Sequence, residues 1–316
     1  MSTANDCNTP ITRRVRAYFA PVDRVSGTPT LFDPAQTGRF DLDAPPAPWR
    51  DLGWCLNFRR SDADGITAVR SGPQAMVTSQ LRSAPDATLA LEFATWGKLQ
   101  LALSSGSQQM NLLPPATGSA TVPSGGDATA AVALDPSSTA AALVVGPTLA
   151  TAFHVGDLVV VDADYAAQTG FLGTGVSGGY VRTAADVRGI DYIRRISLNV
   201  ARIASITGGT LTLDRPLPAG VPAPGMKLSR VTGFVDREGS AFFQEWSALF
   251  VLDGELGDRI LFHYPRLETM HGPREAASTL SAPLQQMRLD AAFRALPVTD
   301  PADGETVLCF RTYLPA

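Results

Sequence analysis

The alternation of apolar and polar residues near the end of the chain constrains the fold most. One side of this pattern carries Met287, Leu289, Ala291, Phe293 and Ala295, and the residues between them are charged or small. A period of two residues is typical of a half-buried strand, whereas a helix would distribute these side chains around its axis. Asp303-Gly304 suits a tight reversal. The pattern therefore predicts one long β-hairpin over 283–316, with its return strand at 305–314.

Segments with the same alternation recur along the chain, separated by Gly, Pro and Asp, which predicts a mainly β protein. The expected strands cover 13–22, 52–60, 86–96, 156–162, 196–206, 210–215, 242–252 and 259–266. Gly97 interrupts the third of these strands, and the leucines that follow favour a short helix ended by Gly106. We expect a β-sandwich or barrel with one short flanking helix and long hairpins.

Changes in composition along the chain predict its domains. The stretch 29–48 is rich in Pro and Asp and predicts an extended arm that crosses a surface. The low-complexity stretch 114–142 predicts a loose connection. The strands within 152–231 predict a small barrel-like β domain, which is inserted between the two parts, 1–142 and 232–316, of a larger β domain.

Composition excludes several classes of protein. With 45% hydrophobic and 18% charged residues among 316, the chain can bury a sizeable core, so disorder of the whole chain is excluded. A net charge of −4 argues against a protein that holds nucleic acid by neutralising phosphates. Cys7, Cys55 and Cys309 are widely separated, which fits neither a disulfide framework nor a zinc site. The polar N-terminus shows no secretory signal, and no apolar stretch is long enough to span a bilayer, so we expect a soluble protein made in the cytoplasm.

Two glycine motifs overlap in one loop. Residues 173–178 match the dinucleotide-binding fingerprint, and 175–179 match the Gly-x-Ser-x-Gly elbow of hydrolases around Ser177. Both motifs need a strand directly before them and a helix directly after, and the sequence predicts neither here. An ordinary glycine-rich loop is therefore the favoured interpretation.

No pattern of metal ligands or catalytic groups stands out. A P-loop is excluded because neither Lys98 nor Lys227 stands in the required motif. The histidines lack the spacing of a zinc site, and we expect each at a strand end or in a loop. The histidines are His154, His263 and His271. The carboxylate groups could supply acid–base pairs or calcium ligands, but we expect all of them in turns, where Asp is common. These groups are Asp162 with Asp164, Asp62 with Asp64, and the acidic residues of 300–305. We predict no catalytic, cofactor-binding or metal-binding residues.

The remaining candidates are basic and aromatic residues. Arg13, Arg14 and Arg16 form the one basic cluster, which could contact phosphate or an acidic partner, although a solvated strand start is favoured. The tryptophans at 49, 54, 96 and 246 are scattered and form no stacking platform for single-stranded nucleic acid. We expect them in cores or interfaces.

Four segments together resemble the tail tube proteins of tailed bacteriophages. They are Leu52-Gly53-Trp54-Cys55-Leu56-Asn57-Phe58, the strand and helix of 88–104, the hairpin of 241–265 and the terminal part 289–315, including Ala295-Leu296-Pro297-Val298. The resemblance covers about two thirds of the chain and depends on pattern rather than on an invariant motif. The domain at 152–231 is the departure, because small members of that family lack it.

The resemblance implies a structural virion protein with a tail-tube-like β fold and no enzymatic activity. Six copies of such a subunit close into a ring, and the rings stack into a tube through which DNA passes without specific binding. The implied partners are other copies of the chain and the tape measure, tail terminator and baseplate or tip proteins, with no cofactor and no membrane. The implied location is the tail of the virion, and the inserted domain is expected on the outer surface of the tube.

Two functions from other classes remain open. One is a β-rich hydrolase that uses the carboxylates near Asp162 or the loop of Ser177. The other is a carbohydrate-binding or adhesin module, which requires aromatic side chains along one exposed face.

Overall fold

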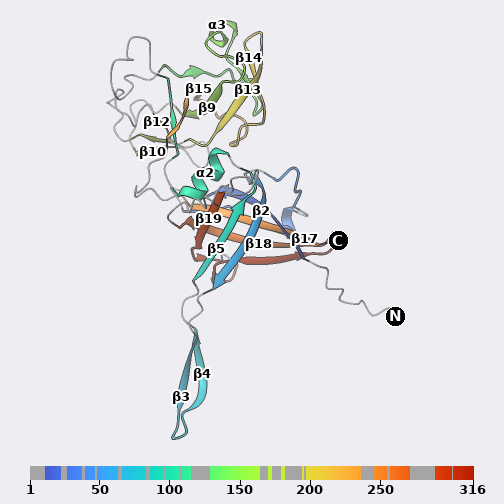
Figure 1. Ribbon diagram of the computed structural model, residues 1–316, viewed down its shortest axis with the longest axis vertical. Helices are drawn as coiled ribbons and strands as arrows, with labels where there is room; N and C mark the ends of the chain where they lie inside the picture. The colour runs from blue at the N-terminus through green and yellow to red at the C-terminus, as the bar shows by residue number, and fades with distance from the viewer. Residues whose placement is uncertain are drawn as a thin grey trace, which may run out of the picture. The chain divides into compact units, whose positions relative to one another are not determined.

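The protein consists of two compact units. The computed structural model describes residues 11–22, 27–37, 40–46, 48–62, 66–82, 86–95, 97–106, 109–114, 129–163, 170–172, 179–181, 194–195, 197–235, 245–254, 257–270, 289–300 and 302–316. Unit 1 comprises Met1–Val22, Pro29–Gly106 and Phe243–Ala316, and unit 2 comprises Asp23–Thr28 and Ser107–Phe242. Both units are built mainly from β-strands (Figure 1).

The elements of unit 1 come from both ends of the chain. They are β1 (Ile11–Pro21), α1 (Pro34–Thr37), β2 (Arg50–Asp62), β3 (Ile66–Ser71), β4 (Met76–Arg82), β5 (Ala87–Phe93), α2 (Lys98–Ser105), β17 (Glu245–Gly254), β18 (Arg259–Thr269), β19 (Leu289–Ala295), β20 (Val298–Thr299), β21 (Thr306–Val307) and β22 (Phe310–Leu314). Each lies within one of the three sequence ranges of unit 1.

Six antiparallel strands of unit 1 form a closed barrel. Their order is β17-β1-β2-β5-β19-β18, and the pairing of β17 with β18 closes the circle. The outer edge of β18 is shared, because residues 267–269 pair with β19 while residues 259–263 pair with the seventh strand, β22. Closure removes the free edges that an open sheet would expose.

Aromatic side chains fill the barrel. Phe19 lies between Phe250 and Phe293, with ring centroids 5.9 and 5.5 Å away. Phe58 and Tyr264 contact the other side of Phe250 at 4.8 and 6.0 Å. These contacts connect β1, β2, β17, β18 and β19, so the interior is a packed core rather than a channel.

The segment between β1 and β2 covers the outer face of the barrel. Its Phe32, Phe40 and Trp49 pack on outward-facing residues of the sheet, which include Tyr18 and Leu249. This is the segment that the sequence analysis predicts as an extended arm, and we call residues 29–49 the arm. Because β17 is buried on both faces, its residues 246–252 form a nearly continuous apolar run rather than an alternating one.

The prediction of one long terminal hairpin is wrong. Only its tip is a hairpin, in which β20 pairs with β21. β19 pairs with β5 and β18, and β22 pairs with β18, so the two long strands lie on β18 rather than on each other. The predicted alternation within the first strand is correct, because Ala291, Phe293 and Ala295 are buried while Arg294 is exposed. Alternation identifies a strand, but it does not identify the strand with which it pairs.

The predicted succession of strand and helix is confirmed. β5 ends at Phe93, and α2 runs from Lys98 to Ser105. Gly106 then ends the helix with a left-handed φ of 62°, and its N–H donates to the carbonyl of Ala102. In the part of the chain that the structure describes, no helix is long and apolar enough to cross a membrane.

Unit 2 contains a curled sheet. Its elements are β6 (Met110–Leu112), β7 (Val132–Ala133), β8 (Ala142–Val144), α3 (Pro147–Ala150), β9 (Leu158–Ala163), β10 (Gly170–Leu172), β11 (Gly179–Val181), β12 (Arg194–Arg195), β13 (Val200–Thr207), β14 (Thr210–Leu213), β15 (Met226–Val231) and β16 (Gly233–Val235). The main sheet has the order β7-β15-β9-β13-β14-β8, and Val159, Val161, Ala201, Leu211 and Leu228 form part of its core. The predicted strands of 156–162 and 196–215 correspond to β9, β13 and β14.

The boundaries of unit 2 are wider than the insertion that the sequence predicts. β7 and β8 lie before residue 152, yet both are strands of the curled sheet. The N–H of Asp135 donates to the carbonyl of Val144, so the segment between β7 and β8 also contacts the sheet. Low complexity in 114–142 conceals these strands, because two or three residues are too few to show a period.

A close backbone approach in unit 2 provides a test of the fold. Gly209 has a φ of +97°, and a Cβ there would lie 2.5 Å from the carbonyl carbon of Gly146. The neighbouring Gly208 has a φ of +57° and open space around it. We expect Gly209→Ala to destabilise unit 2 by about 2 kcal/mol or more, because it combines strain with a clash. We expect Gly208→Asn to cost less than about 0.5 kcal/mol, because Asn tolerates this conformation.

Calorimetric unfolding of the two variants measures the difference. All four tryptophans belong to unit 1, so tryptophan fluorescence separately reports whether that unit is affected. Equal stability of the two variants would show that β13 and β14 do not approach Gly146 in this way.

Candidate assembly surface

The glycine motifs do not lie in the strand–turn–helix arrangement that a dinucleotide site or a hydrolase elbow requires. Residues 173–178, including Ser177, lie outside the described residues. The expectation that no strand precedes them is wrong, because β10 ends at Leu172. However, β11 begins at Gly179, and Leu172 pairs with Gly179 in an antiparallel ladder. The motif therefore connects two strands of a hairpin, whereas both the dinucleotide site and the hydrolase elbow require a helix.

The histidines lie in different environments. His154 is exposed in unit 2, with its Nδ1 3.7 Å from a carboxylate oxygen of Asp157. His263 is buried on β18 in unit 1, in the interior of a strand rather than at its end as expected. His271 lies outside the described residues. Among the residues that the structure describes, no three His, Cys, Asp or Glu side chains form a group that could hold a metal ion.

Asp162 differs from its prediction. A turn is expected there from the sequence, but Asp162 is fully buried within β9, opposite Lys227 of β15. The error arises because the strand continues to Ala163, beyond the apolar run that marks it in the sequence. Asp164 lies outside the described residues. Asp162 is therefore part of the interior of unit 2 and is not an exposed general acid or base.

The other carboxylates are divided between a strand end and a turn. Asp62 is the last residue of β2 rather than a turn residue, and Asp64 lies outside the described residues. Asp300 and Asp303 accept backbone N–H groups two residues ahead, which confirms their predicted turn.

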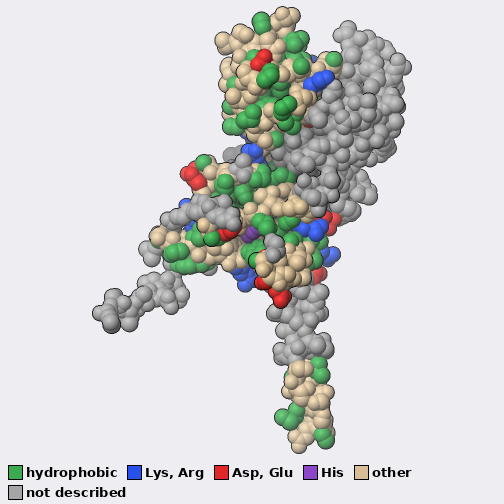
Figure 2. Space-filling model, turned by 180° about the vertical axis from the view of Figure 1, so that it is seen from behind, with side chains coloured by type: hydrophobic (Ala, Val, Ile, Leu, Met, Phe, Trp, Pro, Cys, Tyr) green, Lys and Arg blue, Asp and Glu red, His purple; other side chains and the backbone are tan. Residues whose placement is uncertain are grey.

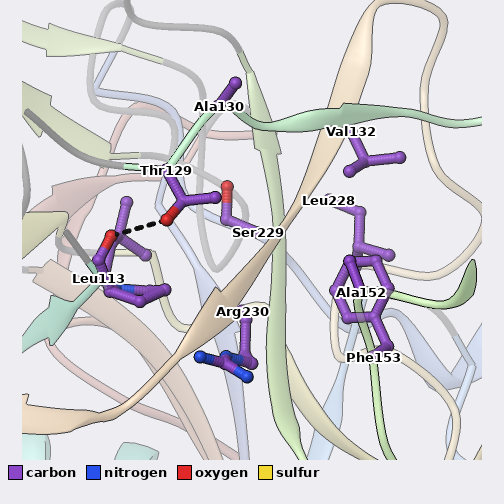
Figure 3. A pocket seen from close by; sticks show the side chains of 10 residues that line it. Leu113, Thr129, Ala130, Val132, Ala152, Phe153, Leu228, Ser229 and Arg230 are labelled. Atoms are coloured by element: carbon purple, nitrogen blue, oxygen red, sulfur yellow. Dashed lines mark hydrogen bonds between the residues drawn. The ribbon is translucent and has the colours of Figure 1, made fainter. Parts of the chain in front are cut away.

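Unit 2 has a small pocket beside β15 (Figure 3). Its volume is about 120 Å³, and it is lined by Leu113, Pro114, Thr129, Ala130, Val132, Ala152, Phe153, Leu228, Ser229 and Arg230. The hydroxyl of Ser229 is buried without a hydrogen-bond partner, and that of Thr129 donates to the carbonyl of Pro114. Neither a histidine nor a carboxylate lines the pocket, so its walls do not provide a base to activate Ser229.

The cysteines and tryptophans are largely structural. Among the described residues, neither Cys55 nor Cys309 forms a disulfide, and burial raises the pKa of Cys55 to about 12. Trp49 and Trp246 are buried, as expected of core residues, whereas Trp54 is 37% exposed. Trp96 and Cys7 lie outside the described residues.

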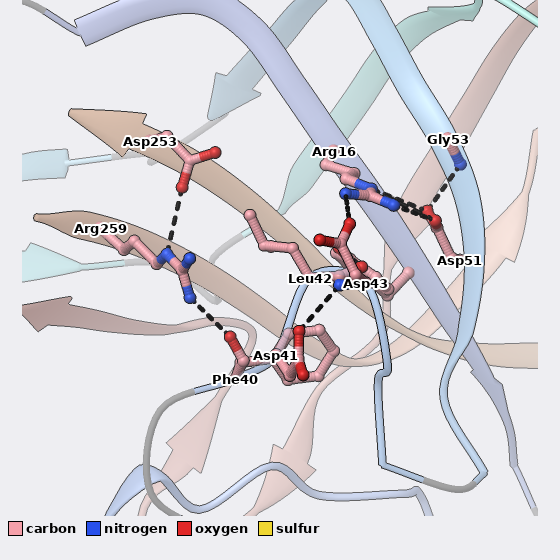
Figure 4. A network of polar contacts seen from close by, with 10 residues as sticks. Arg16, Phe40, Asp41, Leu42, Asp43, Asp51, Gly53, Asp253 and Arg259 are labelled. Atoms are coloured by element: carbon pink, nitrogen blue, oxygen red, sulfur yellow. Dashed lines mark hydrogen bonds and ion pairs between the residues drawn. The ribbon is translucent and has the colours of Figure 1, made fainter. Parts of the chain in front are cut away.

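A charged network fixes the arm to the barrel (Figure 4). Arg16 of β1 donates to carboxylate oxygens of Asp51 and Asp43 at 2.6 and 3.0 Å. The hydrogen bonds to Asp51 are the main reason that the pKa of Arg16 is raised. Arg259 donates to Asp253 at 3.2 Å and to the carbonyl of Phe40 at 2.6 Å. Arg16 thus serves an internal contact, rather than the solvated strand start that the sequence favours, and the side chains of Arg13 and Arg14 are not described.

The hairpin of β3 and β4 has little packing support from the other described elements of unit 1, and it is not predicted from the sequence. Among the described residues, its strands pair only with each other (Figure 1). The described side chains from Ala68 to Ser79 are exposed, except for the half-buried Val69. Met76 and Val77 are 64% and 48% exposed, and apolar atoms are visible on this ribbon in Figure 2. Gly72-Pro73 is the turn signal that could have revealed it.

Comparison of the chain with protein-family models and with curated proteins finds no match. The described residues therefore carry the functional argument by themselves. They include a β-ribbon that exposes backbone edges and apolar side chains. Such a ribbon is a candidate assembly surface.

His263 makes the attachment of the arm sensitive to acid. Its imidazole lies between the rings of Trp49 and Phe310, and its Nε2 is 3.3 Å from the carbonyl of Thr30. Burial lowers its pKa from 6.5 to about 4. The unfolded chain therefore binds more protons between these values, and unit 1 loses stability as the pH falls from about 6.5 to about 4.

We expect this loss to reach about 3 kcal/mol and to disappear largely in His263→Phe. Chemical denaturation at a series of pH values, followed by tryptophan fluorescence, measures it. The exposed His154→Gln is the control and should keep the slope of wild type. An unchanged slope in His263→Phe would contradict the assignment.

Proposed function

We propose that this protein is a structural subunit that assembles with copies of itself into stacked rings. In this proposal it forms the tail tube of a bacteriophage or of a related tail-like particle. The β3–β4 hairpin carries the argument. An isolated two-stranded ribbon is at best marginally stable in water, and its edges invite pairing with other chains. A second chain that covers the hairpin removes both problems.

The rest of unit 1 supports such a role. The barrel has a packed aromatic core, and the arm covers apolar residues of its outer face. A closed and covered barrel is a rigid body, which suits a subunit that must repeat with constant geometry. β22 adds an outer strand that pairs with β18. Subunits joined by a head-to-tail contact form either a closed ring or a filament of unlimited length. A tube of stacked rings contains closed rings and also grows along its axis.

The tail tube assignment also draws on the sequence resemblance. In this role six copies form each ring, and DNA passes through the tube. The net charge of −4 per chain disfavours adhesion of DNA to the wall. The partners are the tape measure, the tail terminator and the baseplate or tip proteins. Unit 2 lies on the outer surface of the tube, and the protein resides in the virion.

Removing the hairpin tests this function. The variant replaces residues 68–80 with a four-residue Gly/Asn turn, and electron microscopy and size measurements over a range of concentrations follow its assembly. We expect rings or tubes from the wild type and none from the variant. We expect equal thermal stability of unit 1 in both, because β3 and β4 pair only with each other in the part of the chain that the structure describes.

A milder pair of variants provides the matched control. Met76→Ser removes an exposed apolar side chain from the hairpin, and Val221→Ser removes one of similar exposure from unit 2. We expect the first to weaken assembly and the second to leave it unchanged. A wild-type protein that stays monomeric at every concentration would refute the proposed function.

A further inference from the structure

The end of the hairpin has a distinctive chemistry. The only charged residues of β3, β4 and the turn between them are Arg70 and Arg82. Arg70 is exposed and donates to the carbonyl of Ala75 at 3.2 Å, which holds its guanidinium at the turn. Met76 and Val77 follow directly. The hairpin therefore presents a positive charge beside an apolar pair.

The arm presents the opposite charge. Residues 40–48 include Asp41 and Asp43 and no basic residue. Both side chains are exposed, that of Asp43 to 91%. The N–H of Asp43 donates to Oδ1 of Asp41, which fixes the turn between them. We call residues 40–43 the acidic turn.

Buried neighbours hold the acidic turn in place. Phe40 is 1% exposed, and its carbonyl accepts the hydrogen bond of Arg259. The carbonyl of Leu42 accepts the hydroxyl of Tyr18 at 2.9 Å. The anchored residues thus alternate with Asp41 and Asp43, and the carboxylates are displayed on a fixed backbone. A preformed surface loses little conformational entropy when it binds.

An exposed aromatic ring belongs to the same surface. The guanidinium of Arg16 contacts Asp43 and lies 5.6 Å from the ring centre of Trp54. Asp43, Arg16 and Trp54 are therefore connected neighbours. Partly exposed tryptophan is a common anchor of protein interfaces. The surface combines carboxylates with an apolar ring, which complements the Arg70 charge and the apolar pair of the hairpin.

We propose that the end of the β3–β4 hairpin of one copy docks on the acidic turn and Trp54 of a neighbouring copy. This inference depends on the proposed self-assembly and identifies the surface that receives the hairpin. Arg70 pairs with Asp41, since Asp43 already binds Arg16, and Met76 and Val77 pack on Trp54. Charge complementarity of this kind sets the register of an interface and the salt dependence of its formation.

Exchange of the two charges tests the contact. We expect Arg70→Asp and Asp41→Arg each to raise the concentration needed for assembly by about fivefold or more, because each places like charges together. We expect the double variant, with both changes in one chain, to assemble within about twofold of wild type. Light scattering over a concentration series measures all three.

Mixing distinguishes a contact between copies from one within a copy. In an equimolar mixture of Arg70→Asp and Asp41→Arg chains, each hairpin finds an opposite charge only on the other chain. We expect the mixture to assemble better than either variant alone. Rescue by the double variant without rescue by mixing would place the contact within one copy and overturn the proposal.

Neutral variants control for local damage. Asp41→Asn keeps an acceptor for the N–H of Asp43, and Arg70→Gln keeps a donor for the carbonyl of Ala75. We expect both to unfold like wild type and to assemble with a weaker dependence on salt. If the wild type assembles and Arg70→Asp assembles equally well, the docking site is wrong while the proposed function stands. If the wild type does not assemble, the proposed function fails as well.

Discussion

The double pairing of β18 is the constraint on which unit 1 depends. One edge of this strand binds β17 along its length, and the other is divided between β22 and β19. The pairing of β18 with both β17 and β19 completes the barrel, in which β1 pairs with β17 and β5 pairs with β19 across the two ends of the sequence. Because residues from both ends of the sequence must meet, the barrel forms through contacts that are distant in the chain, which costs loop-closure entropy.

Burial of β17 on both faces follows from the arm. Its aromatic residues replace water on the outer face, and Arg16 and Arg259 attach its backbone and carboxylates to the barrel. The same attachment places Asp41 and Asp43 at the surface in a fixed arrangement. Packing within the subunit thereby prepares the surface to which the proposed neighbour binds, so stability and assembly are coupled through one segment of about twenty residues.

The sequence predicts local structure better than pairing. It identifies the strand and helix around Gly97 and the strands expected at 196–206 and 210–215, because glycine and periodicity are local signals. It mispairs the terminal strands, since alternation does not specify a partner. Asp162 is misplaced because a buried polar residue in a strand resembles a turn residue in sequence. The hairpin of β3 and β4 is missed because its described side chains, from 68 to 79, are almost all exposed, which leaves little hydrophobic pattern to detect.

The central claim is that the hairpin of β3 and β4 gains a protein partner when the chains assemble. Hydrogen exchange of its backbone amides, compared between dilute and assembled protein, tests this claim directly. The account predicts that amides of 66–82 exchange at least about tenfold more slowly after assembly, while the buried amides of β17 exchange slowly in both states. Equal exchange of the hairpin in dilute and assembled protein would contradict the account.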